Sequence, residues 1–335
     1  MLSERLSLAL AGGDLSLPDG GTIAVFGPRA GTDLSSLPAE RVTVITGFKP
    51  DHDAFAAAGY LCEREAKEPC AVALVCLPRA KAQGRALLAQ AADLVGPGGL
   101  MIVDGQKTDG IESMLRDLRA QGLSPMVLSK AHGKLLWFAA RPMPDDWHAR
   151  GPQPAEGGYL TAEGVFSADG VDPASRLLAE SLPEKIGARV VDLGAGWGYL
   201  AARILARDTV RSIDLVEADH TALECARANI SDPRARFHWA DATTWRPESP
   251  VDAVVMNPPF HTGRAADPDL GRAFIAAAAA MLAPQGRLWL VANRHLPYET
   301  ALAQHFAEVI ELDGDNRFKI LAAARPTAPR SRQRH

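Results

Sequence analysis

Strand-like apolar runs alternate with helix-like segments twice along this chain of 335 residues, and this repeat most limits the folds it can adopt. In the first half the predicted strands are 22–26, 42–46, 71–77, 100–103 and 134–139, with helices at 79–95 and 111–121. In the second half the predicted strands are 189–193, 212–217, 236–240, 253–256 and 286–292, with helices at 199–206, 222–229 and 271–282. Such alternation is typical of mostly parallel sheets covered by helices. It predicts two α/β units rather than a sandwich or a bundle.

Prolines and glycines are concentrated between the two halves, at Pro142, Pro144, Gly151, Pro152, Pro154, Gly157 and Gly158. They interrupt both helical and strand periodicity, as a linker does. A single hydrophobic core rarely serves more than about 250–300 residues, so two domains are expected. We predict a first domain at 1–141, a linker at 142–158, a second domain at 159–325 and a basic tail at 326–335. The tail is either a contact for phosphate groups or a solvated end.

Bulk properties exclude several classes of protein. The formal net charge of −4 argues against a generally cationic nucleic-acid binder, although it is compatible with one local basic patch. The four cysteines form no Cys-x-x-Cys pair, so neither a metal site nor a disulfide framework is expected. No apolar stretch reaches the ~20 residues of a membrane-spanning helix, and no signal peptide is recognisable. We expect a cytoplasmic monomer without metal or membrane contact.

A glycine-rich turn follows the first strand of the second half, in residues 190–198. The strand contains Asp192, and Gly194, Gly196 and Gly198 follow it just before a helix. Glycine lets the backbone approach a ligand closely, and the ligand then lies at the carboxyl edge of the sheet near the helix N-terminus. Nicotinamide and flavin enzymes use similar turns, and a purely structural turn is also compatible with this pattern.

Two carboxylates further along narrow the choice of cofactor. Glu217 closes the next strand, where a carboxylate can accept hydrogen bonds from both ribose hydroxyls of an adenosine ligand. Asp241 ends the third strand and can accept a bond from the adenine amino group, although a turn or cap aspartate is the alternative. Asp219 is better explained as a helix cap. With the glycine turn, these residues fit an adenosine cofactor that ends in an amino acid better than one that carries a pyrophosphate.

The most informative residues are Asn257-Pro258-Pro259-Phe260, directly after the fourth strand. Two prolines fix the backbone and remove two N–H donors. The side-chain oxygen of Asn257 and the carbonyl of Pro258 can then both accept hydrogen bonds from an –NH₂ group and direct its lone pair at a sulfonium methyl. Phe260 offers a face on which a base can stack. This pattern predicts transfer of a methyl group from S-adenosylmethionine to the exocyclic amine of a nucleic-acid base.

Basic residues and histidines near this turn are secondary candidates. His261 can act as a donor behind the turn or merely cap the loop. His295, Arg264, Arg272 and Arg294 can contact phosphate groups, and ordinary surface roles are the alternative for each.

Several motifs in order resemble the ribosomal RNA guanine 2-amino methyltransferases, the family of ribosomal RNA small subunit methyltransferase C and its large-subunit relative. They are 164–172 (GVFSADGVD), 192–198, 257–263 (NPPFHTG), 291–298 and 317–319 (RFK). The resemblance implies two tandem Rossmann-like class I methyltransferase domains, with S-adenosylmethionine as cofactor and ribosomal RNA or a ribosomal subunit as partner. It also implies that Phe166, and with it Asp172, lies against the methionine part of the cofactor.

The first half resembles the family's N-terminal domain more weakly. The turn at 26–31 (FGPRAG) places Pro28 and Arg29 where a cofactor loop needs glycine, and Leu77-Pro78-Arg79 replaces the Asn-Pro-Pro turn. The resemblance therefore implies a degenerate domain without a cofactor site, which holds RNA or stabilises its neighbour.

Other functions remain compatible with some of these motifs. DNA adenine and protein glutamine methyltransferases also use an Asn-Pro-Pro-aromatic turn, and a nicotinamide dehydrogenase shares the glycine turn but not Asn257 to Phe260. A non-catalytic RNA-binding assembly factor is the alternative from another class, against which the intact Asn257 turn argues.

Overall fold

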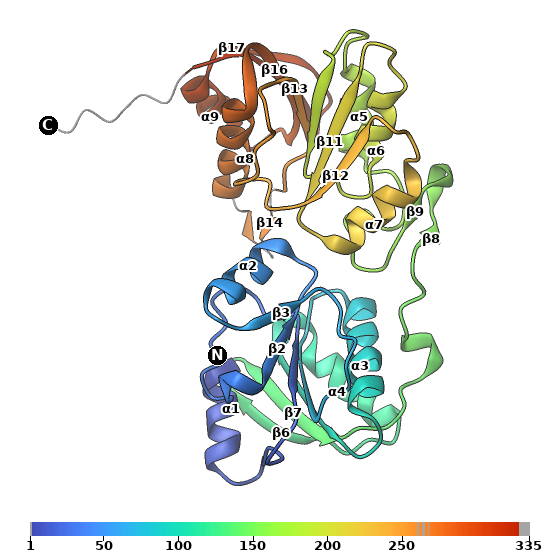
Figure 1. Cartoon of the computed structure of the whole chain (residues 1–335), viewed down its shortest axis with the longest axis vertical. Helices are drawn as coiled ribbons and strands as arrows, with labels where there is room; N and C mark the ends of the chain where they lie inside the picture. Colours follow the sequence, from blue (N-terminus) through green and yellow to red (C-terminus); the bar gives the residue numbers. More distant parts are fainter. Residues whose placement is uncertain (1, 260, 263–264, 267, 328–335) are drawn as a thin grey trace, which may run out of the picture. The chain divides into compact units, whose positions relative to one another are not determined.

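The computed structural model describes residues 2–259, 261–262, 265–266 and 268–327. The chain divides into two compact units, Met1–Gly151 and Pro152–His335 (Figure 1). The division lies within 142–158. Part of that range is packed, since Trp147 is 3% exposed and contacts the core of the first unit, whereas Gln153–Pro154 pairs with Leu160–Thr161 in the second.

The first unit is a seven-stranded sheet in the order β3-β2-β1-β4-β5-β7-β6, in which β7 runs against its neighbours. Its strands are β1 (Ile23–Phe26), β2 (Val42–Ile45), β3 (Leu61–Glu63), β4 (Val72–Cys76), β5 (Leu100–Gln106), β6 (Met126–Lys130) and β7 (Gly133–Ala139). Its helices are α1 (Leu2–Ala11), α2 (Lys49–Ala57), α3 (Lys81–Val95) and α4 (Ile111–Ala120). Apolar clusters lie on both faces of the sheet.

The second unit has the same strand arrangement, β12-β11-β10-β13-β16-β18-β17. Its strands are β8 (Gln153–Pro154), β9 (Leu160–Thr161), β10 (Arg189–Leu193), β11 (Ser212–Glu217), β12 (Ala235–Trp239), β13 (Val251–Met256), β14 (His261–Thr262), β15 (Ala265–Ala266), β16 (Leu282–Asn293), β17 (Phe306–Gly314) and β18 (Phe318–Pro326). Its helices are α5 (Pro173–Ser181), α6 (Tyr199–Leu205), α7 (His220–Asn229), α8 (Pro268–Met281) and α9 (Tyr298–His305). The expected α/β architecture with two sheet domains is confirmed.

Helices cover both faces of the second sheet, as Figure 1 shows. Residues of α5, α6 and α7 pack with one set of strand side chains, and residues of α8 and α9 pack with the other set. Neighbouring strand residues therefore face opposite cores, for example Val190 and Val191 in β10. Local signals explain where helices begin: Asp172 caps α5 with Pro173 as its first residue, and Asp219 caps α7.

Several strands differ from the sequence expectation. The predicted ranges contain neither β3, β6, β17 and β18 of the two large sheets nor the short strands β8, β9, β14 and β15, and β16 begins four residues earlier than the predicted 286. β17 is an edge strand with almost every residue at least partly exposed, so it carries no alternating apolar pattern. Among the helices of the described ranges, none is long and apolar enough to cross a membrane.

A buried ion pair fastens α1 to the sheet of the first unit. The side chain of Arg5 is fully buried, and its guanidinium donates to both carboxylate oxygens of Asp104 in β5, at 2.7 and 2.8 Å. A third bond, of 3.0 Å, runs from Arg5 to the carbonyl of Lys130. Because this fork matches the carboxylate, the pair is satisfied as a unit, and removing one partner leaves a buried charge.

We predict that Arg5→Met destabilises the first unit by about 3–5 kcal/mol, because Asp104 then remains buried without its partner. Denaturant unfolding measures the change. Glu4→Gln is the matched control in the same helix. Glu4 forms an exposed pair with Lys130 at 3.8 Å, and such pairs contribute about 0–1 kcal/mol. Equal stability losses in the two variants would contradict the assignment.

Candidate active site

The glycine turn begins where β10 ends, and two of its three glycines, Gly196 and Gly198, serve different purposes. All have positive φ: 80° at Gly194, 55° at Gly196 and 89° at Gly198. A Cβ atom on Gly198 would lie 2.9 Å from the side chain of Ile230, so glycine there permits close helix packing. Around a Cβ on Gly196, no described atom beyond the adjacent residues of the chain lies within 4 Å. Gly196 therefore leaves an open cradle in which a ligand can approach the backbone.

Glu217 supports this turn from the end of the neighbouring strand β11. Its carboxylate accepts the Gly196 amide at 2.8 Å through Oε2 and the Asp219 amide at 2.7 Å through Oε1. Each oxygen keeps a further lone pair, so the carboxylate can still accept hydroxyl donors. Burial raises the pKa of Glu217, and the amide hydrogen bonds offset part of that rise. Asp219 itself accepts the Thr221 amide at 2.8 Å, and so acts as the helix cap expected from the sequence.

Asp192 lies beneath the turn and is fully buried. Within the described ranges neither of its carboxylate oxygens has a hydrogen-bond partner. Burial raises the pKa of Asp192 to about 7. The Ala201 amide opposes this rise, although its contact with the carboxylate falls short of hydrogen-bond geometry, and the Glu217 carboxylate adds to it. A buried acid without a partner suits a site that receives positive charge, and S-adenosylmethionine carries a sulfonium and an ammonium group. The residues of this turn therefore fit that cofactor.

Asp241 stands two residues beyond the end of β12, at the same edge of the sheet. Its Oδ1 accepts both the Thr243 amide, at 2.8 Å, and the Thr243 hydroxyl, at 2.7 Å. The turn role left open by the sequence is thus present. The second oxygen, Oδ2, remains available to a donor such as an adenine amino group.

Phe166 and the glycine turn lie against each other. The indole N–H of Trp197, a residue of the turn, donates to the carbonyl of Phe166 at 3.0 Å. The side chain of Phe166 is 58% exposed, although it is large and apolar. Beside it, Trp197 packs on Tyr159 with ring centroids 5.0 Å apart. The segment before α5 therefore forms one side of the cradle.

Asn257 follows β13, the strand on the other side of β10. Its amide nitrogen donates to Asp172 Oδ2 at 3.0 Å and to Ser175 Oγ at 2.8 Å. Both N–H groups are thus engaged, and Oδ1 is left as the acceptor. Pro258 is buried behind it. Phe260, predicted as the stacking partner of the base, lies outside the described residues.

The sequence interpretation missed Ser175 and the contact of Asp172 with Asn257. The Asp172-Pro173 pair signals the start of a helix, and that signal accounts for the cap. It carries no information about a partner 85 residues away. The packing of α5 on the sheet, where Leu178 shares a core with Val190 and Ala253, brings the two segments together.

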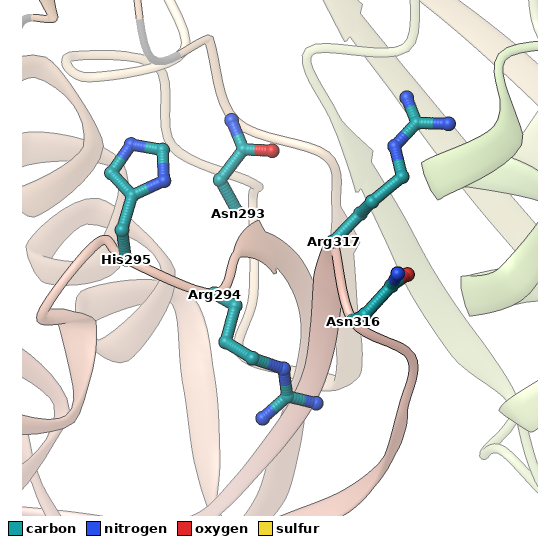
Figure 2. Close-up of a pocket in the computed structure, with 5 residues that line it drawn as sticks. All are labelled: Asn293, Arg294, His295, Asn316 and Arg317. Atoms are coloured by element: carbon teal, nitrogen blue, oxygen red, sulfur yellow. The ribbon is translucent and has the colours of Figure 1, made fainter.

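A basic pocket opens one strand further along the same edge (Figure 2). It measures about 500 Å³ and is lined by Asn293, Arg294, His295, Asn316 and Arg317. Asn293 ends β16 and pairs with Phe318, so the pocket lies at the carboxyl edge of the sheet. In Figure 2 the side chains of Asn293, His295 and Arg317 extend to one side, and that of Arg294 extends to the other.

The basic candidates from the sequence separate into different roles. Arg294 is engaged by the protein, donating to the Asp315 carbonyl at 2.7 Å and to Glu311 at 3.0 Å. Arg272 pairs with Asp269 in its own helix. Arg264 and the side chain of His261 lie outside the described residues. Arg317 is exposed, and its guanidinium stacks over the ring of Phe318 at 4.9 Å.

All four cysteines are free thiols. The described residues contain no group of three or more His, Cys, Asp or Glu side chains that could hold a metal ion.

Comparison with known proteins gives consistent results. Residues 156–322 match the family model of the methyltransferase small domain. The ribosomal RNA small subunit methyltransferase C of Shewanella halifaxensis is 31% identical over 258 residues, which are 74% of this chain and 75% of that protein. The corresponding protein of Shewanella amazonensis is 30% identical over 263 residues, 75% of this chain and 76% of that protein. The T. thermophilus 16S rRNA N2 methyltransferase (RsmC), solved with AdoMet and guanosine, has a TM-score of 0.78 and 26% identity, and covers 96% of this chain and 91% of its own.

The strand order, the methyltransferase domain match and the structural likeness agree on one class: S-adenosylmethionine-dependent methyltransferases of class I. Within that class the chain belongs to the family of ribosomal RNA small subunit methyltransferase C. The resemblance inferred from the motifs is thereby confirmed. A nicotinamide dehydrogenase, which shares only the glycine turn, is excluded.

We predict that the affinity for S-adenosylmethionine rises with pH between about 6 and 8. Asp192, with a pKa of about 7, is mostly protonated below this range and ionised above it, and only the ionised form attracts the positive cofactor strongly. Ionisation then increases from roughly one-tenth to nine-tenths, which allows up to about a tenfold gain in affinity. Isothermal titration calorimetry at several pH values measures it.

Asp192→Asn is the control for this prediction. The cofactor's own amino group titrates equally with both proteins, so the difference between the two pH profiles isolates Asp192. Parallel profiles would show that Asp192 does not titrate in response to the cofactor.

Proposed function

We propose that this enzyme methylates the exocyclic 2-amino group of a guanine in ribosomal RNA of the small subunit, with S-adenosylmethionine as methyl donor. The observation that carries the proposal is the state of Asn257, whose two N–H groups are bound internally so that Oδ1 remains an acceptor. Family membership and the guanosine bound to the T. thermophilus relative support guanine as the target. They favour it over a DNA adenine or a protein glutamine.

Asn257 and Pro258 position the amine in this proposal. Asn257 Oδ1 and the Pro258 carbonyl each accept one N–H of the guanine amine, which draws the nitrogen towards tetrahedral geometry and frees its lone pair. The bound cofactor supplies an electrophilic methyl group. The nitrogen becomes acidic only as the new C–N bond forms, so water can take the proton and no strong base is needed. Phe260 is proposed to stack on the base.

The cofactor is proposed to lie along the carboxyl ends of β10, β11 and β12. Glu217 accepts the ribose hydroxyls with the lone pairs that the backbone amides leave free. Asp241 Oδ2 accepts the adenine amino group, and Phe166 covers the methionine part. Gly196 lets the ligand approach the turn, since no described atom beyond the adjacent residues of the chain lies within 4 Å of a Cβ placed there.

The first unit is proposed to bind no cofactor. Asp51 of α2 accepts the Ala30 amide at 2.8 Å and pairs with Arg29 at 3.2 Å, so this buried carboxylate occupies the turn after β1. After β4, at the position where the second unit has its acceptor turn, Arg79 replaces the second proline and lies 3.9 Å from Asp109. The side chain of an arginine only donates hydrogen bonds, so a turn with a cationic residue at this point does not present acceptors alone.

The basic pocket is proposed to contact RNA phosphates on either side of the target base. His295 and Arg317 extend to the same side of it, and the pocket lies at the edge of the sheet where Asn257 follows β13. Phosphate contacts give register and affinity without reading sequence, which suits an enzyme with a net charge of −4 and local basic groups. With ribosomal RNA as its substrate, the enzyme is proposed to act as a monomer in the cytoplasm.

We predict that Asn257→Ala lowers turnover by about two to three orders of magnitude while the affinity for S-adenosylmethionine stays within about threefold, because the amide acts only on the amine. Radiolabelled methyl transfer to small-subunit RNA from cells that lack the enzyme measures turnover. Nucleoside mass spectrometry of the product is expected to show 2-methylguanosine. Turnover at the wild-type level, or another methylated nucleoside, would overturn the proposal.

We also predict that the basic pocket contributes to RNA affinity through Arg317. Arg317→Gln is expected to weaken RNA binding and to lower the slope of log affinity against log salt by about one, because one phosphate contact is lost. Arg211→Gln is the matched control, since this exposed arginine precedes β11 at the opposite edge of the same sheet. Fluorescence anisotropy at several salt concentrations measures both. Identical slopes in the two variants would remove the pocket from the RNA interface.

A further inference from the structure

We propose that Asp172 and Ser175 are positioning residues that lock the orientation of the Asn257 amide. The inference rests on the proposed role of Asn257 as an acceptor for the substrate amine. It adds two residues that do not touch the substrate, and it explains how one of two possible amide orientations is selected.

An asparagine amide can present either its oxygen or its nitrogen to a ligand, and the two orientations differ by a rotation of about 180°. The amine of the substrate brings only N–H donors to Asn257. An amide that presents its oxygen accepts one of them, whereas an amide that presents its nitrogen opposes donor to donor. The orientation of the Asn257 amide therefore decides whether this turn can bind the substrate amine.

Two groups on one side of Asn257 hold its amide, and the carboxylate of Asp172 settles this choice because, unlike the Ser175 hydroxyl, it cannot donate. Nδ2 donates to Asp172 Oδ2 at 3.0 Å and to Ser175 Oγ at 2.8 Å. Turning the amide over would break both bonds and would place Oδ1 against a carboxylate oxygen, which is an acceptor only. The Ser175 hydroxyl could then donate to Oδ1, so it would recover one bond, whereas the contact with Asp172 would become repulsive. Ser175 is 7% exposed, so water does not readily replace its hydroxyl. The bond to the ionised carboxylate is of the stronger, charge-assisted type.

Asp172 is itself held in place by the start of α5. The same oxygen, Oδ2, accepts the Ser175 backbone amide at 2.8 Å as the helix cap. The preceding segment is fixed by the Thr161 hydroxyl, which donates to the Ala168 carbonyl at 2.6 Å. One carboxylate oxygen thus joins the first turn of α5 to the end of β13. Asp172 and Ser175, which form a clamp on the Asn257 amide, therefore have little freedom to follow the amide if it rotates.

A purely structural role for these bonds can be separated from positioning by the choice of variant. Ser175→Ala removes one acceptor of the Asn257 amide but keeps the backbone amide that Asp172 caps. Ser181→Ala is the matched control in the same helix, because that hydroxyl lies 2.8 Å from the Leu177 carbonyl and 3.2 Å from Asp313 Oδ2, so it too joins α5 to another element. A role limited to helix stability would affect the two variants alike.

Steady-state kinetics of the full chain, with small-subunit RNA from cells that lack the enzyme, gives the main test. Ser175→Ala is expected to lower kcat about tenfold, with unchanged KM for S-adenosylmethionine and RNA and an unchanged melting temperature. Ser175→Thr, which keeps a hydroxyl, is expected to restore most of the loss. Asp172→Asn keeps an acceptor oxygen and is expected to retain more activity than Asp172→Ala.

A spectroscopic measurement on the wild-type protein avoids any dependence on variant folding. The side-chain N–H protons of Asn257, assigned by comparison with Asn257→Ala, are expected to exchange with water at least tenfold more slowly than those of Asn316, an exposed asparagine. Equal exchange rates would overturn the clamp.

The turnover of Ser175→Ala and that of Asn257→Ala together distinguish a failure of the clamp from a failure of the proposed function. If Ser175→Ala keeps wild-type kcat while Asn257→Ala is inactive, the clamp is wrong and the acceptor role stands. If Asn257→Ala also keeps wild-type turnover, the proposed function itself fails.

Discussion

The parallel pairing of β10 with β11 and β13 is the constraint on which the site depends. Asp192 pairs with Leu215 on one side and with Val255 on the other, so the three strands end together. The glycine turn, Glu217 and Asn257 each follow or occupy one of these carboxyl ends. A shift of one residue in this register would move Asn257 and also turn each strand side chain to the opposite face. The apolar cores on both faces therefore fix the geometry of the site.

Buried charge at this edge reflects function more than stability. Asp192 is buried without a hydrogen-bond partner among the described residues, and the Glu217 carboxylate accepts hydrogen bonds from two backbone amides. Burial raises the pKa of both groups, which means that the folded chain holds them at a cost. Groups of this kind cluster where a ligand later supplies the missing charge or donors. In the proposed site, the positive groups of the cofactor supply the charge and its ribose hydroxyls supply the donors, so that cofactor binding and the stability of this edge are coupled.

The sequence predicted the central strands, the glycine turn and the acceptor turn, because each depends on residues that are adjacent in the chain. It failed at the sheet edges, where β17 is exposed and β6 lacks a clear alternating pattern, so their pairing with β18 and β7 comes from tertiary context. It also failed for Ser175, whose importance depends on a contact with Asn257. Local patterns identify which groups are chemically capable, and long-range pairing determines which of them meet.

The two units show that the fold and the chemistry are specified by different residues. Their seven strands follow the same order, and apolar clusters support both faces of each sheet. At the carboxyl edge the first unit closes its turn with Asp51 and Arg29, whereas the second keeps Gly196 open. Because turn residues contribute little to the cores, a copy of the fold can exchange them without losing its architecture. In the mechanism proposed above, the catalytic capacity of the second unit resides in a few residues at the ends of its strands and in the helix start that holds Asn257 in place.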